Sequence, residues 1–119
     1  SGSALLNSSF VDVIDKIANA LTQIEGRIAV EGHTDNIPIN TFAFPSNWDL
    51  SAARSVAVVR RMLDIAPLQP TRVTASGFAD TRPQAVKTTV EGRARNRRVE
   101  IVVKQPLDDE SDALLREIR

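Results

Sequence analysis

A carboxylate and a guanidinium flank the longest loop that the sequence predicts. Asp35 follows a predicted strand, and Arg54 lies about one turn inside a predicted helix, so both side chains should meet at one end of a sheet. Such a pair suits a zwitterionic ligand, because Asp35 would accept hydrogen bonds from an ammonium group and Arg54 would donate two parallel bonds to a carboxylate. Two other interpretations remain open: the residues pair with each other, or Asp35 accepts hydrogen bonds only from backbone amides of its own loop.

The first elements are a helix and a strand. Ser9 and Asp12 can cap the helix at its start, and Gly26 ends it. Residues 27–31 alternate as a strand that stops at Gly32, where the missing side chain permits close approach of another chain or a ligand. The apolar face of the helix is expected to consist of Phe10, Val13, Ile14, Ile17, Leu21 and Ile24.

A long loop and a second helix come next. Residues 33–47 contain two prolines and no sustained period, and loops of this length in compact domains are often functional. The helix is expected at about residues 50–63, with Asp49 or Ser51 as its cap. Its inward-facing residues are expected to include Val56, Val59 and Leu63.

The remaining elements define the fold class. Residues 72–76 and 99–104 are strand candidates, residues 90–97 are a helix candidate, and Leu114, Leu115 and Ile118 suggest a short terminal helix. Strands separated by helices favour a two-layer α/β (α+β) fold, with a mixed sheet covered by helices on one face. The length of 119 residues suits one domain, residues 1–119.

Composition excludes several classes of function. Fifteen basic residues balance fifteen acidic ones, so no net charge draws the chain to nucleic acid, although Arg93, Arg95, Arg97 and Arg98 cluster. There is no cysteine and one histidine, so neither a metal cluster nor a disulfide is expected. No apolar run is long enough to span a membrane.

Two single residues could suggest other chemistry. His33 beside Asp35 hints at a general base, but no nucleophile motif accompanies it, so we expect a structural ring bonded to a nearby backbone group. Trp48 could stack on a sugar, but a tryptophan just before a helix more often packs on the core, and we expect it to do so.

Four ordered motifs resemble the OmpA-like peptidoglycan-binding domain: GHTD at residues 32–35, NWDLS at 47–51 with Arg54 soon after, GF at 77–78 followed by Pro83, and NRRVEI at 96–101. The resemblance covers nearly the whole chain and implies an OmpA-like two-layer sandwich. It implies that Asp35 and Arg54 bind the diaminopimelate of the wall's stem peptide. Asn47, Thr34 and Leu50 would be their neighbours. No catalytic residue, metal or cofactor is implied.

Within that family, residues 36–39 and the Asn47-Trp48 pair resemble flagellar stator proteins of the MotB type more than OmpA or Pal envelope-tethering domains. This resemblance implies a periplasmic domain of an inner-membrane protein, a homodimer, and a MotA-type membrane subunit as partner. It also implies that a first strand, a plug and a transmembrane segment lie outside this chain, since residues 1–4 resemble the segment immediately after the family's first strand.

Three classes of function compete. The leading hypothesis is a non-catalytic module that anchors a motor complex to peptidoglycan. The second is a peptidoglycan hydrolase that uses His33 and Asp35. The third is a purely structural domain that only dimerises.

Overall fold

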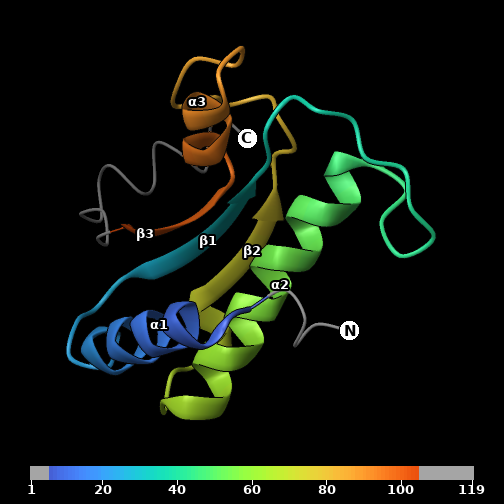
Figure 1. The fold of residues 1–119 in the computed structure, drawn as a ribbon. Coiled ribbons are helices and arrows are strands. Elements are labelled where there is room, and N and C mark those ends of the chain that lie inside the picture. Colours follow the sequence, from blue (N-terminus) through green and yellow to red (C-terminus); the bar gives the residue numbers. More distant parts are fainter. Residues whose placement is uncertain (1–5, 105–119) are drawn as a thin grey trace, which may run out of the picture.

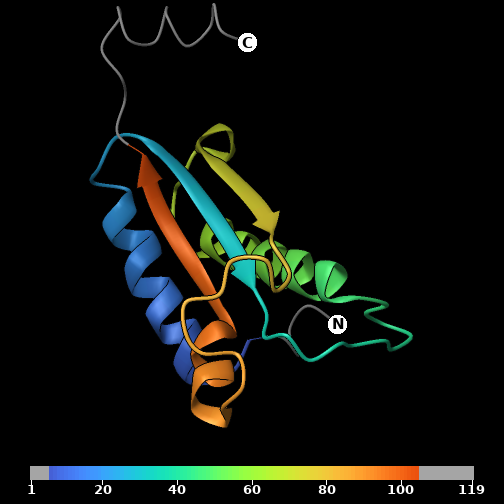
Figure 2. The same ribbon diagram turned by 90° about the horizontal axis from the view of Figure 1, so that it is seen from above.

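The computed structural model describes residues 6–104. The elements are α1 (Ser8–Leu21), β1 (Arg27–His33), α2 (Asn47–Ile65), the short 3-10 helix η2 (Pro70–Arg72), β2 (Val73–Gly77), α3 (Val90–Asn96) and β3 (Arg98–Lys104). The strands form a three-stranded mixed sheet in the order β2-β1-β3, in which β1 pairs parallel to β2 and antiparallel to β3. Helices α1 and α2 cover one face, and α3 lies beyond one end of the sheet (Figures 1 and 2). The expected α+β class with a mixed sheet is confirmed.

Helix α1 has its cap two residues before the expected one. Asn7 is the N-cap, because its side-chain oxygen accepts a hydrogen bond of 2.9 Å from the amide of Phe10. The prediction of Ser9 as the cap is wrong, since Ser9 lies inside the helix and its hydroxyl donates to Asn7. The helix ends at Leu21, and Gly26 instead occupies the turn before β1 with a φ of 124° that favours glycine.

Helix α2 starts three residues earlier than expected because its cap lies upstream, and it ends two residues later than expected, at Ile65. The Ser46 side chain accepts a hydrogen bond of 3.3 Å from the amide of Asp49 and donates one of 2.7 Å to its carboxylate. The predictions of Asp49 or Ser51 as the cap are therefore wrong. Val56 is exposed, and the buried positions of α2 are Ser51, Ser55, Ala57, Val58 and Met62.

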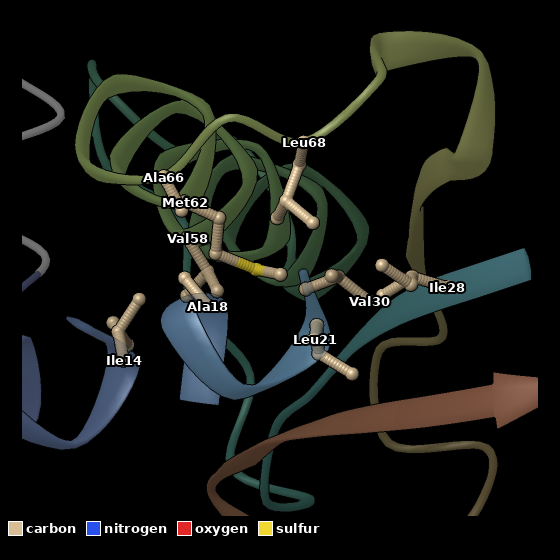
Figure 3. Close-up of a cluster of buried hydrophobic side chains, with 9 residues drawn as sticks. All are labelled: Ile14, Ala18, Leu21, Ile28, Val30, Val58, Met62, Ala66 and Leu68. Carbon is tan, nitrogen blue, oxygen red and sulfur yellow. The ribbon is translucent and has the colours of Figure 1, made fainter. Parts of the chain in front are cut away.

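The hydrophobic core lies between the two helices and the sheet (Figure 3). Val13 and Ile24, expected on the apolar face of α1, are exposed instead, because the buried stripe runs through Ile14, Ala18 and Leu21. The Arg72 guanidinium donates hydrogen bonds to the carbonyl of Leu21 at the end of α1 and to two carbonyls of the turn that leads to β1. The fully packed cluster consists of Ile14, Ala18, Leu21, Ile28, Val30, Val58, Met62, Ala66 and Leu68.

Two glycines let α2 approach the sheet closely. A Cβ atom at Gly32 would lie 2.1 Å from the backbone oxygen of Ser51, and one at Gly77 would lie 2.5 Å from the amide nitrogen of Ala52. The expected close approach at Gly32 is therefore made by another segment of the chain. Ser51 is buried, and its hydroxyl accepts a hydrogen bond of 3.0 Å from the amide of Ala79. These contacts place the first turns of α2 over the ends of β1 and β2.

None of the helices within residues 6–104 combines the length and the apolarity that a membrane span requires. The predicted terminal helix at residues 114–118 and the motif at residues 1–4 lie outside the described residues.

Candidate binding site

A pocket of about 330 Å³ opens where β1 ends and α2 begins. It lies between the loop that follows β1, the first turns of α2, and the junction of α3 with β3. All five residues that the sequence singled out as candidates meet there, although they come from two separate segments. The lining consists of Thr34, Asp35, Ile37, Pro38, Ile39, Asn47, Leu50, Arg54 and Arg97.

Asp35 is largely buried in the site, with only 9% of its surface exposed. Its Oδ1 atom accepts a hydrogen bond of 3.0 Å from the amide of Ile37, and its Oδ2 atom accepts one of 2.7 Å from Nη1 of Arg97. A carboxylate offers roughly four lone-pair positions, so Asp35 can still accept hydrogen bonds from a ligand. The interpretation that Asp35 accepts hydrogen bonds from its own loop is thus correct in part, because it accepts one from the amide of Ile37. The interpretation that Asp35 pairs with Arg54 is not supported, because its ion-pair partner is Arg97.

Arg97 is the charged residue of the site that sequence reasoning missed. It belongs to the NRRVEI motif and to the arginine cluster, but neither feature indicates a contact with a residue 62 positions earlier. The contact arises because β3 runs antiparallel to β1 with His33 opposite Arg98, which places Arg97 beside the residues that follow β1. The register of a strand pair that is distant in sequence cannot be read from either strand alone.

Arg54 is half-buried in the pocket, and no ion pair joins it to any residue of the described range 6–104. Burial lowers the pKa of its guanidinium, the nearby charge of Arg97 lowers that pKa further, and Asp35 opposes the shift. With two guanidinium groups and one carboxylate, the pocket has a formal charge of +1. Arg54 is therefore placed to bind an anionic group, which would offset the cost of burying its charge.

Asn47 and Thr34 shape the pocket through the backbone. The side-chain amide of Asn47 donates to the carbonyl of Ile37 at 3.1 Å and approaches the carbonyl of Asp35 at 3.5 Å. Thr34 is buried, its hydroxyl donates to the carbonyl of Asp35 at 2.9 Å, and its amide donates to the carbonyl of Ala79 at 2.9 Å. Both residues hold the loop that carries the Asp35 carboxylate.

The pocket also has an apolar wall. Ile37, Pro38 and Ile39 form it together with Leu50 from α2. The first three were noted in the sequence only as a family signature, because nothing in a loop without periodicity indicates which side chains face a pocket. The site therefore combines charged groups with a surface that suits an aliphatic chain.

Two expectations about aromatic residues are wrong. Trp48 has 55% of its surface exposed, because α2 already starts at Asn47 and its first turn presents Trp48 to the outside rather than to the core. His33 is buried, but its ring makes no hydrogen bond to the backbone, and both ring nitrogens lack a partner among the described residues. The ring stacks on Phe78 with centroids 5.3 Å apart, and it does not line the pocket.

Comparisons with known proteins agree with this architecture. The OmpA family model matches residues 1–97. Motility protein B of Bacillus subtilis (strain 168) is 36% identical over 104 residues, which are 87% of this chain and 40% of that protein. The chain spans about two fifths of the length of that protein and of motility protein B from Helicobacter pylori, and 28% of the length of outer membrane porin F from Pseudomonas aeruginosa.

Solved structures share the fold. The cell wall anchor of the T6SS from Pseudomonas aeruginosa has a TM-score of 0.77 and 43% identity, covering 84% of this chain and 69% of that one. The periplasmic domain of Helicobacter pylori MotB has a TM-score of 0.79 and 27% identity, covering 94% of this chain and 73% of that one. With a family match over most of its length and the fold of a MotB periplasmic domain, this chain belongs to the OmpA family.

Proposed function

We propose that this domain binds peptidoglycan without cleaving it, through the diaminopimelate of the stem peptide, and that it anchors a flagellar stator complex to the cell wall. The observation that carries the proposal is the half-buried Arg54, which has no ion-pair partner in the described part of the chain and lies beside Asp35 in a pocket with an aliphatic wall. The names of the relatives support the same proposal, since one is a motility protein and one solved structure is a cell wall anchor.

Each chemical feature of the ligand has a counterpart in the pocket. The free end of diaminopimelate carries a carboxylate and an ammonium group on an aliphatic chain. Arg54 would donate two hydrogen bonds to the carboxylate, and Asp35 would accept from the ammonium group while Arg97 holds it in place. Ile37 and Ile39 would contact the methylene groups.

A single site of this kind binds weakly. Each charge-assisted hydrogen bond contributes about 1.5 to 3 kcal/mol, so one stem peptide should bind with a dissociation constant on the order of micromolar to millimolar. Firm anchoring then requires two linked domains, which raise the effective concentration of the second site. We therefore propose a homodimer in the periplasm, joined in the full-length protein to a MotA-type membrane subunit.

The decisive experiment compares two kinds of wall. Purified domain is incubated with insoluble sacculi of the diaminopimelate type and of the lysine type, and the pellets are quantified after washing. Lysine lacks the terminal carboxylate that Arg54 would bind, so the domain should sediment with the first wall and stay in the supernatant with the second. Equal recovery in both pellets, or in neither, would contradict the proposal.

Variants assign the binding to the pocket. Asp35→Ala and Arg54→Ala should each abolish sedimentation, whereas the matched exposed changes Asp12→Ala on α1 and Arg60→Ala on α2 should not. Soluble muropeptides released into the supernatant during long incubation would instead support the hydrolase that His33 and Asp35 suggested. If both pocket variants fold normally and still sediment, the assignment of the site is wrong.

The motor role needs a separate test, because an OmpA or Pal type of envelope tether would bind the wall in the same way. A chimera in which this domain replaces the matching part of motility protein B from Bacillus subtilis should restore swimming in a strain that lacks that protein. A chimera that is stable and wall-bound but leaves the cells non-motile would favour the tether.

A further inference from the structure

A second cluster of chemically active side chains lies on the other face of the sheet. Ile28 and Val30 of β1 belong to the core beneath the helices. Glu31 and His33 occupy the alternate positions of the strand and therefore point away from that core. Glu100 of β3 is the register partner of Glu31, which brings its carboxylate to the same place. One donor atom from each of Glu31, His33 and Glu100 lies within 4.8 Å of the others.

The imidazole of His33 has no hydrogen-bond partner within the described residues. The residue is only 2% exposed, neither ring nitrogen is bonded there, and Nε2 lies 3.7 Å from Oε2 of Glu100. A buried polar group without a partner is rare in a native structure and calls for an explanation. A ligand shared by the imidazole and the two carboxylates would provide one.

We infer that Glu31, His33 and Glu100 bind a divalent transition-metal ion of the Zn²⁺ class. Donor atoms about 2.1 Å from a tetrahedral ion lie roughly 3.4 Å from one another, so modest side-chain rotations from the present separations bring three ligands into place, and a water molecule would be the fourth. An imidazole with two carboxylates suits Zn²⁺, whereas Mg²⁺ and Ca²⁺ prefer oxygen ligands alone. This ion-binding site is separate from the pocket around Asp35 and goes beyond the proposed wall binding.

The cluster is flanked by charges of both signs. Burial and the charges of Arg98 and Arg82 lower the pKa of the His33 imidazole, and the carboxylates of Glu100 and Glu31 oppose that shift. The guanidinium of Arg98, which donates to Glu100, and the nearby guanidinium of Arg82 offset the formal charge of the two carboxylates.

Arg98 would become an outer partner of the ion-binding site. It donates to Glu100, and the carbonyls of Asn96 at 3.2 Å and Arg82 at 3.0 Å hold its guanidinium independently of that contact. The oxygen that Arg98 holds, Oε2 of Glu100, is also the one nearest to Nε2 of His33, so metal binding requires either that Oε1 turns toward the imidazole or that Oε2 is shared between Arg98 and the ion. Ligating carboxylates commonly have such a second hydrogen-bond partner.

The test is direct because the chain has one histidine and no cysteine. Chain without an affinity tag is freed of metal with a chelator and titrated with ZnCl₂ by calorimetry, while NMR follows the nitrogen signals of the single imidazole. We expect one saturable ion per chain and a coordination shift at Nε2 of His33. Mg²⁺ should produce neither effect.

Isosteric variants identify the ligands without disturbing the buried ring. Glu31→Gln and Glu100→Gln should each weaken Zn²⁺ binding at least about tenfold, whereas Glu91→Gln on the exposed side of α3 should change nothing. No heat and no imidazole shift with the wild-type chain, or equal affinity in all three variants, would overturn the inference. Sedimentation with sacculi in the presence of chelator reports separately on the wall-binding proposal.

Discussion

Replacing Arg54 by methionine should separate binding from stability. Methionine has a similar length and no charge, so it fills the same half-buried position without the guanidinium. The arginine is disfavoured where it lies, because burial and the neighbouring Arg97 both lower its pKa and so oppose its charged form. We therefore expect the Arg54 guanidinium to strengthen ligand binding while lowering the free energy of unfolding.

The two effects have opposite signs and different sizes. Losing a two-point contact with a carboxylate should cost about 2 to 4 kcal/mol of binding free energy, which is roughly a 30-fold to 1,000-fold rise in the dissociation constant. The free energy of unfolding should stay unchanged or rise by up to about 1 kcal/mol. For a chain of 119 residues, a rise of that size corresponds to an increase in melting temperature of up to about 4 °C.

Two measurements on the same preparations check this prediction. Calorimetry with a soluble stem peptide that contains diaminopimelate gives the affinity, and thermal unfolding gives the melting temperature. Arg60→Met is the matched control, because Arg60 lies on the same helix but is exposed and outside the pocket. If Arg54→Met melts well below that control, or binds the peptide as the wild type does, the reasoning about Arg54 is refuted.

Three further changes test how the scaffold holds the site. Gly32→Ala should lower the free energy of unfolding by about 1 to 3 kcal/mol in chemical denaturation, because the new Cβ would lie 2.1 Å from the Ser51 oxygen; an unchanged midpoint would contradict that close contact. Arg61→Met should lower the melting temperature at neutral pH, because the hydrogen bond from Arg61 lowers the pKa of Asp15 below its ordinary value of 3.8. The stabilisation by this bond is present above pH 3.8 and is lost as the pH falls through the pKa of Asp15 in the folded state. The melting temperatures of the variant and the wild type should therefore converge in acid. Asn47→Ala should accelerate amide hydrogen exchange in residues 36–39 and cost about 1 kcal/mol of stability, and unchanged exchange would show that Asn47 does not hold the loop.

Local patterns determined much of the architecture. The spacing of apolar residues located both long helices and the alternation located β1, because each pattern reflects which face of one element is buried. The ends of the helices were less accurate, since Asn7 and Ser46 each compete with several other good capping residues nearby. The positions of Asp35 and Arg54 on either side of the loop followed from these same elements.

The partners of those residues were decided only by the tertiary structure. The contact between Arg97 and Asp35, and the meeting of His33 with Glu100, both depend on the antiparallel register of β1 and β3. A strand's own sequence specifies which side chains share a face, but its alignment with a distant strand depends on the packing of the whole sheet. The sequence by itself therefore determined which groups could do chemistry, and the folded chain decided which of them meet, because contacts across a sheet join residues whose separation along the chain carries no periodic signal.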